Sequence, residues 1–301
     1  MIRTGMVPLC ALICLFAIGS AEAETPGSLP ILKLAPDARS AALGEAGTAG
    51  SGGATAAFHN PALLAFADRS QAAFAYTDWL LDLSLQSGAL LFPHGDFSFG
   101  LSFNVFTTPE IERRVLPSDD PIETFDAHDL TAGISLGYRL KDNLALGLTA
   151  RYLYQQIYVE DATGISADIG IAYHLTSRGI TLGGAIRNVG RMGPLQQEES
   201  PLPTSLNFGV EGIIFTLEEF GLRGLGDLQF FLEDDLRLHA GLEGFWKEHF
   251  FLRAGYQSGS ELRSFSGGAG LGWKDYQFDY AYQPLAEDFE ASHRFTLSLN
   301  F

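Results

Sequence analysis

The chain has 301 residues, of which 46% are hydrophobic and 18% charged, and its formal net charge is −17. This composition is too hydrophobic for a disordered chain, and the acidic balance argues against nucleic acid as a partner, since binding its backbone needs basic patches. Both cysteines, Cys10 and Cys14, lie near the start of the chain, so the remainder has no disulfide, no cysteine metal ligand and no cysteine nucleophile.

The first residues have the pattern of a secretory signal peptide. Arg3 precedes an apolar run over residues 7–18, and Ala21-Glu22-Ala23 has the form of a cleavage site. We therefore expect residues 1–23 to be removed, the alternative being an N-terminal membrane anchor. No later apolar run reaches the ~18 residues of a membrane-spanning helix, so we expect either a soluble exported protein or a membrane β-barrel.

Residues 71–301 alternate with a period of two, which is typical of strands. Large apolar side chains share one face and small or polar ones the other, as with Leu144, Leu146 and Leu148 opposite Ala145, Gly147 and Thr149. The alternation predicts strands near residues 71–79, 83–92, 96–106, 128–140, 143–158, 163–175, 179–189, 203–215, 226–234, 237–246, 249–257, 264–274, 276–283 and 291–301. An even strand number is typical of bacterial outer-membrane barrels. The prediction is an all-β fold, a transmembrane antiparallel β-barrel of about 14 strands over residues 71–301, with a soluble exported β-protein as the alternative.

The lengths of the expected connections support the barrel. The long ones, 107–127 and 190–202, have the same parity, whereas 141–142 and 247–248 are tight turns of the opposite parity. Outer-membrane barrels have long extracellular loops and short periplasmic turns. The connection 216–225 is the exception, because it is long where this rule requires a short turn.

Several residue types indicate which way the strands face. A charged side chain in lipid is costly, so charged residues on the small-residue faces are expected in the lumen. They are Arg139, Arg151, Asp168, Arg187, Glu211, Arg253 and Asp279. Aromatic residues at strand ends, among them Trp79, Trp246 and Trp273, predict interfacial girdles. The final Phe301 matches the terminal-strand signal used by the barrel assembly machinery.

Residues 24–70 differ in composition from the barrel. They are rich in Pro, Ala and Gly, and they contain Phe58, Leu63 and Leu64 as apolar side chains to bury. We expect them to form a compact plug (hatch) in the lumen, the alternative being a flexible periplasmic linker. The glycine-rich run 267–272 fits no nucleotide-binding fingerprint and is expected to be a lumenal gap against which this plug packs.

This N-terminal segment resembles a known family. The run 38–47, followed by 57–63, looks like the N-terminal signature of the PorV/PorQ proteins, which are related to the FadL-type long-chain fatty acid transporters. The resemblance implies a fourteen-stranded outer-membrane barrel with a hatch, whose motif is matched by Asn60-Pro61-Ala62. The chain departs from the family pattern at Leu63, where glycine is usual, and at Gly52-Gly53, which replace an acidic pair.

Signals of catalysis are weak. The seven histidines form no H-x-x-x-H pair, and no G-x-S-x-G elbow occurs, so we expect no enzyme activity, no cofactor and no metal site. The long acidic connection, including Glu110, Glu112, Asp119 and Asp120, suggests either bridging through divalent cations to lipopolysaccharide or simply a solvated surface.

Two functions follow from the resemblance. Similarity to PorV implies an outer-membrane protein of a Gram-negative-type bacterium that binds exported proteins and supports their secretion or surface attachment, as in type IX secretion. Residues 115–117 and 194–195 are the candidate contacts. Similarity to FadL implies instead the transport of long-chain fatty acids or other hydrophobic small molecules past Asn60. A structural barrel without cargo is a third reading.

Overall fold

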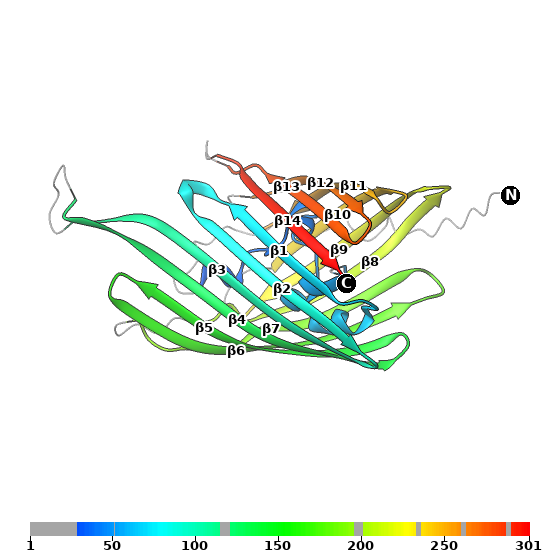
Figure 1. Ribbon diagram of the computed structural model, residues 1–301, viewed down its shortest axis with the longest axis horizontal. Helices are drawn as coiled ribbons and strands as arrows, with labels where there is room; N and C mark the ends of the chain where they lie inside the picture. The colour runs from blue at the N-terminus through cyan, green and yellow to red at the C-terminus, as the bar shows by residue number, and fades with distance from the viewer. Residues whose placement is uncertain are drawn as a thin grey trace.

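The computed structural model describes residues 29–301 except 51, 115–120, 196–200, 233–235, 260–262 and 287–289, and it shows a closed β-barrel. Each of the fourteen strands pairs with its neighbours in sequence, and the last pairs antiparallel with the first (Figure 1). This confirms the all-β fold and the predicted number of strands. Among the described residues, no helix is long and apolar enough to cross a membrane. The predicted signal peptide, residues 1–23, lies outside the described residues.

The strands and helices have the following bounds. The strands are β1 (Gln71–Asp78), β2 (Ser84–His94), β3 (Phe97–Arg113), β4 (Glu123–Lys141), β5 (Leu144–Ile157), β6 (Glu160–Leu175), β7 (Ile180–Met192), β8 (Ser205–Leu217), β9 (Phe220–Phe231), β10 (Leu236–Trp246), β11 (Phe250–Gln257), β12 (Phe265–Trp273), β13 (Tyr276–Gln283) and β14 (Ser292–Asn300). The helices are α1 (Ala38–Ala42) and the 3-10 helices η1 (Pro30–Leu32), η2 (Gly53–Phe58), η3 (Pro61–Phe66) and η4 (Leu80–Asp82).

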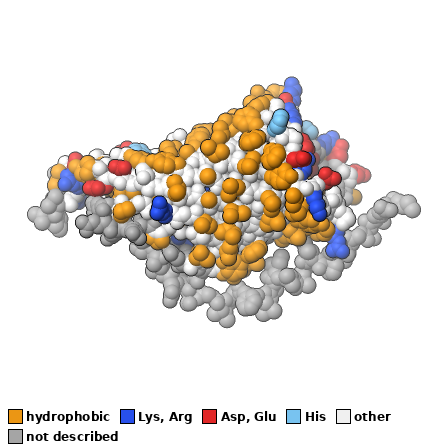
Figure 2. All heavy atoms as spheres, turned by 90° about the horizontal axis from the view of Figure 1, so that it is seen from below, with side chains coloured by type: hydrophobic (Ala, Val, Ile, Leu, Met, Phe, Trp, Pro, Cys, Tyr) orange, Lys and Arg blue, Asp and Glu red, His pale blue; other side chains and the backbone are white. Residues whose placement is uncertain are grey.

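The two faces of the wall differ as the alternation predicts. In β5, Ala145, Thr149 and Leu153 are buried, whereas Leu146 and Leu148 point outward and are exposed. Figure 2 shows hydrophobic side chains over the middle of one outer face and most charged side chains toward its two ends. The outer wall therefore has the apolar band of a barrel that faces lipid.

The two ends of the barrel differ in their connections. The turns after β2, β4, β6, β8, β10 and β12 are all two to four residues long, and we call this the tight-turn end. The prediction of a long connection at 216–225 is wrong. β8 continues to Leu217 and β9 begins at Phe220, so the turn between them consists of Glu218 and Glu219. The connection expected at 107–127 is also shorter, because β3 and β4 continue as a paired hairpin in which Arg113 lies opposite Glu123. In both places, strand residues near the rim lack the simple polar–apolar alternation of the wall.

Two of the three tryptophans expected in the aromatic girdle lie on the outer surface. Trp273 is 63% exposed, and Trp246 also points outward. The prediction that Trp79 belongs to the outer girdle is wrong. The guanidinium groups of Arg263 and Arg294 lie 5.0 and 5.8 Å from the centre of its ring. Both arginines are buried, so Trp79 belongs with the inward-facing charges and not with the outer band.

The N-terminal segment packs against the inward-facing side chains of the wall. Its first residues, Leu29 and Ile31, share an apolar cluster with Leu85 and Leu153, while η3 packs near the tight-turn end. The fit is close at Gly147, where an added Cβ would come within 2.2 Å of the amide nitrogen of Ala62. The small residues of the strands therefore make room for the backbone of the N-terminal segment.

Candidate functional site

The N-terminal segment is attached to the wall by two different kinds of contact. We call residues 37–48 the charged lobe and residues 53–66 the apolar lobe. The charged lobe begins at Asp37, whose Oδ1 accepts the Ser40 amide at 2.9 Å and so caps α1. The Ala38 amide donates to Thr296 Oγ1 of β14 at 2.8 Å, which fixes the start of the helix on the wall.

Asp37 also links the two lobes. Its Oδ2 lies 3.2 Å from Nε2 of His59, and both side chains are buried. Burial opposes ionisation of Asp37, but the His59 ring and the hydrogen bonds from Ser40 outweigh it and hold the pKa of this carboxyl well below its usual range. The carboxylate is therefore the favoured form at neutral pH.

The centre of the charged lobe is an ion-pair network around Glu243 of β10. The Glu243 side chain is fully buried, and its Oε2 accepts from Arg39 Nε at 3.0 Å and from Arg253 Nε at 2.7 Å. Arg223 of β9 contacts the other carboxylate oxygen. Removing the carboxylate would leave three guanidinium groups facing one another.

The network continues into the wall on both sides of Glu243. Arg253 Nη1 donates to Asp279 Oδ1 of β13 at 2.7 Å, and Arg223 Nε lies 3.1 Å from Glu211 Oε1 of β8. Strands β8, β9, β10, β11 and β13 therefore share one set of charges with α1. A network with most members paired is rigid, because each group holds its neighbours in place.

The rest of the charged lobe is also held by polar contacts. Glu45 pairs with Arg263 Nη1 at 2.6 Å, and His239 Nδ1 lies 2.7 Å from the Gly44 carbonyl oxygen. The amides of Gly47 and Thr48 both donate to Asp227 Oδ2 at 2.8 Å. Burial opposes ionisation of Glu45, but Arg263 and the neighbouring cationic side chains lower its pKa.

The apolar lobe is held at its start by Asn60. The side chain of Asn60 caps η3 by accepting the Ala62 amide at 3.1 Å, and its Nδ2 donates to the carbonyl oxygens of Thr48 at 2.9 Å and Ile171 at 3.1 Å. Pro61 follows at the first helical position, where a missing N–H costs little. Asn60 thus joins the two lobes to each other and to β6.

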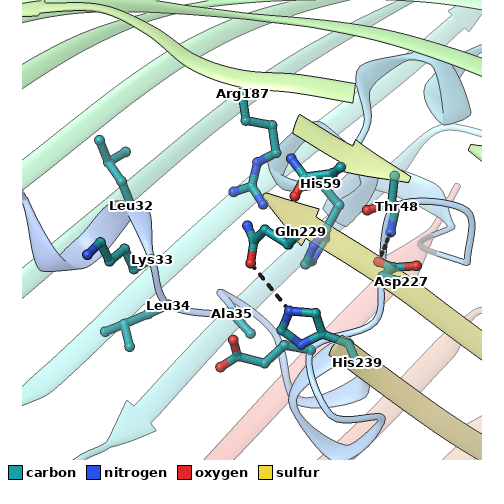
Figure 3. A pocket seen from close by; sticks show the side chains of 12 residues that line it. Leu32, Lys33, Leu34, Ala35, Thr48, His59, Arg187, Asp227, Gln229 and His239 are labelled. Carbon is teal, nitrogen blue, oxygen red and sulfur yellow. Dashed lines mark hydrogen bonds between the residues drawn. The ribbon is translucent and has the colours of Figure 1, made fainter. Parts of the chain in front are cut away.

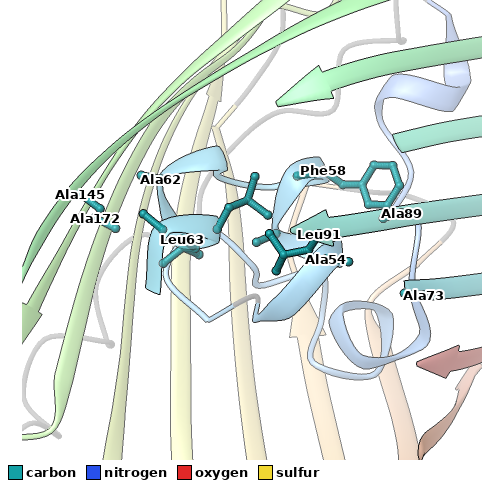
Figure 4. Close-up of a cluster of buried hydrophobic side chains, with 13 residues drawn as sticks. Ala54, Phe58, Ala62, Leu63, Ala73, Ala89, Leu91, Ala145 and Ala172 are labelled. Atoms are coloured by element: carbon teal, nitrogen blue, oxygen red, sulfur yellow. The ribbon is translucent and has the colours of Figure 1, made fainter. Parts of the chain in front are cut away.

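Apolar packing holds the remainder of this lobe. Figure 4 shows Ala62 and Leu63 beside Ala145 and Ala172, and Phe58 beside Ala89, within one cluster of buried side chains. Two cations from the wall reach its backbone: Arg139 donates to the Ala65 carbonyl oxygen at 2.7 Å, and Arg151 to that of Ala57 at 3.2 Å.

A small polar cavity lies between the charged lobe and the wall. It has a volume of about 30 Å³, and Figure 3 shows Arg187, His59, Gln229 and His239 around it. Lys33, Glu45 and Asp227 also line it. This volume holds about two water molecules, whereas pockets for drug-sized ligands measure roughly 300–1,000 Å³. Among the described residues, no group of three His, Cys, Asp or Glu is placed to hold a metal ion.

A family model described as type IX secretion system protein PorV matches residues 21–184, more than half of the chain. The chain belongs to the PorV family. The matched region includes both lobes and the strands from β1 to the start of β7. No curated protein sequence matches the chain.

Solved structures similar to this PorV-family chain include a channel, a transporter and a FadL homologue. They include the CymD monoaromatic hydrocarbon channel (TM-score 0.63, 12% identity, 88% of this chain and 97% of that one). They also include the toluene transporter TodX of Pseudomonas putida (0.61, 14%, 88% and 98%) and a FadL homologue of Pseudomonas aeruginosa (0.53, 14%, 92% and 98%). At these identities the likeness shows the fold alone, which is a FadL-like barrel.

The structure places the seven charged residues expected in the lumen at four different sites. Glu211, Arg253 and Asp279 join the Glu243 network. Arg151 and Asp168 form a buried pair at 2.5 Å. Arg139 reaches the apolar lobe, and Arg187 lines the cavity. Residues Asn60, Pro61 and Ala62 lie at the start of η3 and are buried.

Two other expectations concern the ends of the chain and its connections. Phe301 follows β14, its amide donates to the Ser70 carbonyl oxygen at 2.9 Å, and its ring is exposed beside Phe92. Leu195, one of the candidate contacts with exported proteins, is partly buried and packs against the apolar cluster that contains Leu29. Residues 115–117, Asp119 and Asp120 lie outside the described residues.

Sequence reasoning did not single out the charged residues of the N-terminal segment. Asp37, Arg39 and Glu45 lie in the segment rich in Pro, Ala and Gly and are not among the predicted site residues, although they carry most of its ionic contacts. One local signal was available, because Asp37 stands three residues before Ser40 in the spacing of a helix N-cap. The partners of Arg39 and Glu45, more than 200 positions away, leave no local signal.

Proposed function

We propose that this PorV-family protein spans the outer membrane with its lumen closed by the N-terminal segment, and that it binds exported proteins and supports their secretion or surface attachment. In this proposal residues 1–23 are a signal peptide, 24–70 the plug and 71–301 the barrel. The tight-turn end faces the periplasm, as is usual for outer-membrane barrels.

The observation that carries the proposal is how the lumen is filled. The charged lobe is paired with strands β8–β14, and the apolar lobe is packed on strands β1–β6. The cavity between the charged lobe and the wall has room for about two water molecules and is lined mainly by polar side chains. A barrel closed in this way suits a protein that works through its outer surfaces better than one that passes solutes.

The membrane placement is supported by the outer surface. The outward side chains of the strands are large and apolar, and Trp246 and Trp273 lie at the tight-turn end, where aromatic side chains favour the interface. Phe301 is exposed after the last strand, as an assembly signal read by the barrel assembly machinery would have to be. The opposite end carries acidic side chains, including Glu110 and Glu112, which suit contact with lipopolysaccharide through divalent cations.

Transport of a fatty acid or other hydrophobic molecule is the second candidate. It is favoured by an apolar cluster at the end opposite the tight turns, formed by Leu29, Ile31, Leu32, Leu85, Phe106, Leu153, Ala162, Met192 and Leu202. Two of the similar structures are a monoaromatic hydrocarbon channel and a toluene transporter. A ligand of that class would have to enter by displacing part of this cluster.

Native purification distinguishes the two functions. The tagged protein is extracted from outer membranes in mild detergent beside an unrelated tagged barrel as the control, and co-purifying proteins and lipids are identified by mass spectrometry. The proposal predicts exported proteins that share a C-terminal domain, enriched only with this protein. Fatty acids or hydrocarbons released only on unfolding, without a protein partner, would reverse the ranking.

A further inference from the structure

At the tight-turn end, some strands extend past the last residue paired with a neighbouring strand, and we call such an extension a step. The longest step is that of β8 beyond β7. The last pair between β7 and β8 joins Ile180 to Gly212, and the Ile213 amide still reaches the Gly179 carbonyl oxygen at 3.4 Å. From there β8 continues to Leu217, paired only with β9. On its other side, residues 214–217 have no backbone partner among the described residues. The β8–β9 hairpin reaches far along the barrel's long axis in Figure 1.

This edge offers free backbone groups. The pair Leu217–Phe220 closes a two-residue turn, and such a closing pair exchanges its hydrogen bonds within the hairpin. Because alternate residues of an antiparallel strand direct their polar groups to opposite sides, Thr216 directs its N–H and C=O to the open side. An added strand would find these groups already aligned.

The side chains of this edge differ from those at two other steps of the same rim. Residues 213–217 read Ile-Ile-Phe-Thr-Leu, and the exposed fractions are 53% for Ile214, 45% for Phe215 and 69% for Leu217. The step of β2 contains Pro93, and the step of β4 contains Arg139 and Lys141. Proline, charge and β-bulges all help to keep an open edge from pairing. Residues 213–217 contain no proline and no charge, and the register shift between Ile213 and Phe215 leaves residues 215–217 regularly paired with β9.

Neither lipid nor water suits such an edge by itself. In lipid, the free N–H and C=O groups would have no hydrogen-bond partner, which is why open sheet edges are absent from the hydrocarbon region. In water, a contiguous group of exposed apolar side chains marks an interaction surface. An added strand satisfies the backbone groups and covers the apolar side chains together.

We propose that residues 213–217 of β8 form a docking edge for an extended segment of another protein on the tight-turn side of the barrel. The partner segment carries β-branched or aromatic residues at alternate positions and a basic residue beside them. The basic residue is favoured by Glu218 and Glu219 in the adjoining turn, of which only Glu219 has an ion-pair partner among the described residues, Lys247 at 3.1 Å. This proposal goes beyond the function above, because it holds whether the cargo is a protein or a small molecule.

The test uses the full-length protein in lipid nanodiscs and a defined probe. The probe is a fluorescein-labelled peptide of alternating valine and threonine with a lysine at each end, measured by fluorescence anisotropy against empty nanodiscs. The matched control is the same peptide with its alternate amides N-methylated. We expect saturable binding of the first peptide and at least ten-fold weaker binding of the second. Equal binding of the two would overturn the proposal.

Variants at one position locate the binding. Thr216→Pro removes the N–H on the open side and should weaken binding at least ten-fold, whereas Thr216→Val keeps the N–H and should bind as the wild type does. Folding of each variant is checked by the gel shift between boiled and unboiled samples. A folded Thr216→Pro variant that binds with unchanged affinity contradicts the proposal.

Two further measurements do not depend on the proline variant. In the wild type, the peptide should slow hydrogen exchange of the Thr216 amide, and Glu218→Gln should weaken binding of the lysine-bearing peptide several-fold. Protection of the Thr216 amide before any peptide is added would mean that the edge is already covered. Dimers in sedimentation that Thr216→Pro abolishes would assign the edge to a second copy. Either result would overturn the proposal of a different partner chain.

Discussion

The two lobes of the N-terminal segment are held in the same lumen by opposite means. The charged lobe contacts strands β8–β14 through carboxylates, guanidinium groups and backbone amides, centred on Glu243. The apolar lobe contacts strands β1–β6 through Ala, Leu and Phe side chains and through backbone brought close by glycines such as Gly147. Asp37 joins the lobes through its contact with His59, and Asn60 joins them through its hydrogen bond to the Thr48 carbonyl oxygen.

This difference predicts different responses of the two lobes. Buried charge pairs gain little net stability when complete and lose much when one partner is removed. Apolar packing loses stability in proportion to the atoms removed and is insensitive to pH. Removal of a charge or a change in pH should therefore detach the charged lobe from the wall, whereas the apolar lobe should stay in place.

The largest effect is expected from Glu243→Gln. The change leaves Arg39, Arg223 and Arg253 together without their shared carboxylate, at a cost of about 3–5 kcal/mol. Hydrogen exchange measured by mass spectrometry should rise more than ten-fold over residues 37–48 and little over residues 53–66. Equal exposure of both lobes would show that they are one unit.

Glu219→Gln is the matched control for that variant. Glu219 is exposed and pairs only with Lys247 at the rim, so its loss should change stability by less than about 1 kcal/mol.

Leu64→Ala tests the apolar lobe. Leu64 is fully buried in the cluster with Leu91, Ala145 and Ala172, and its truncation should cost about 2–5 kcal/mol. Exchange should rise over residues 53–66 and leave residues 37–48 protected. Leu297→Ala, an exposed position on the outer face of β14, is the control, and a similar rise there would mean that the effect is not local.

Acid should loosen only the charged lobe. Because the pKa of Asp37 is lowered in the folded protein, its contribution is present above the ordinary carboxyl pKa and is lost as the pH falls through the lower folded value. Protection of residues 37–48 should thus be constant from pH 7 to about pH 4 and decline below that. Asp37→Asn should cost about 1–3 kcal/mol at neutral pH and remove part of the decline. An unchanged acid profile in this variant would contradict the assignment.

The smallest expected effect lies in the wall and should spare both lobes. Lys247 and Glu248 are the two central residues of the β-turn after β10, and they have φ values of 54° and 55°, a conformation that favours glycine at the second position. Glu248→Gly should stabilise the barrel by about 0.5–1 kcal/mol in thermal unfolding, with no change in exchange of either lobe. A change in the lobes would show that wall stability and lobe stability are coupled.

Much of the barrel could be predicted from local pattern. Fourteen strands were expected, and the inward face of β5 was assigned correctly, because small or polar inward side chains alternate strictly with large apolar outward ones. The pattern failed at the rim. Residues 107–113 and 216–225 lack that alternation, so paired strands were read as connections.

The lumenal contacts were harder to predict than the wall. Charges such as Arg253 and Asp279 were expected inside, since lipid excludes them, but nothing local joins Arg39 to Glu243 across 204 positions. Which strand faces which part of the N-terminal segment depends on strand tilt and register, which are properties of the closed barrel.

Conductance in planar lipid bilayers tests the central claim most directly. The wild-type protein is compared with a variant lacking residues 29–66, which contain both lobes, after both pass the gel-shift test for folding. The account predicts a closed wild type and steady conductance through the shortened protein. Steady conductance of the same size through both would contradict it, because the N-terminal segment would then not close the lumen.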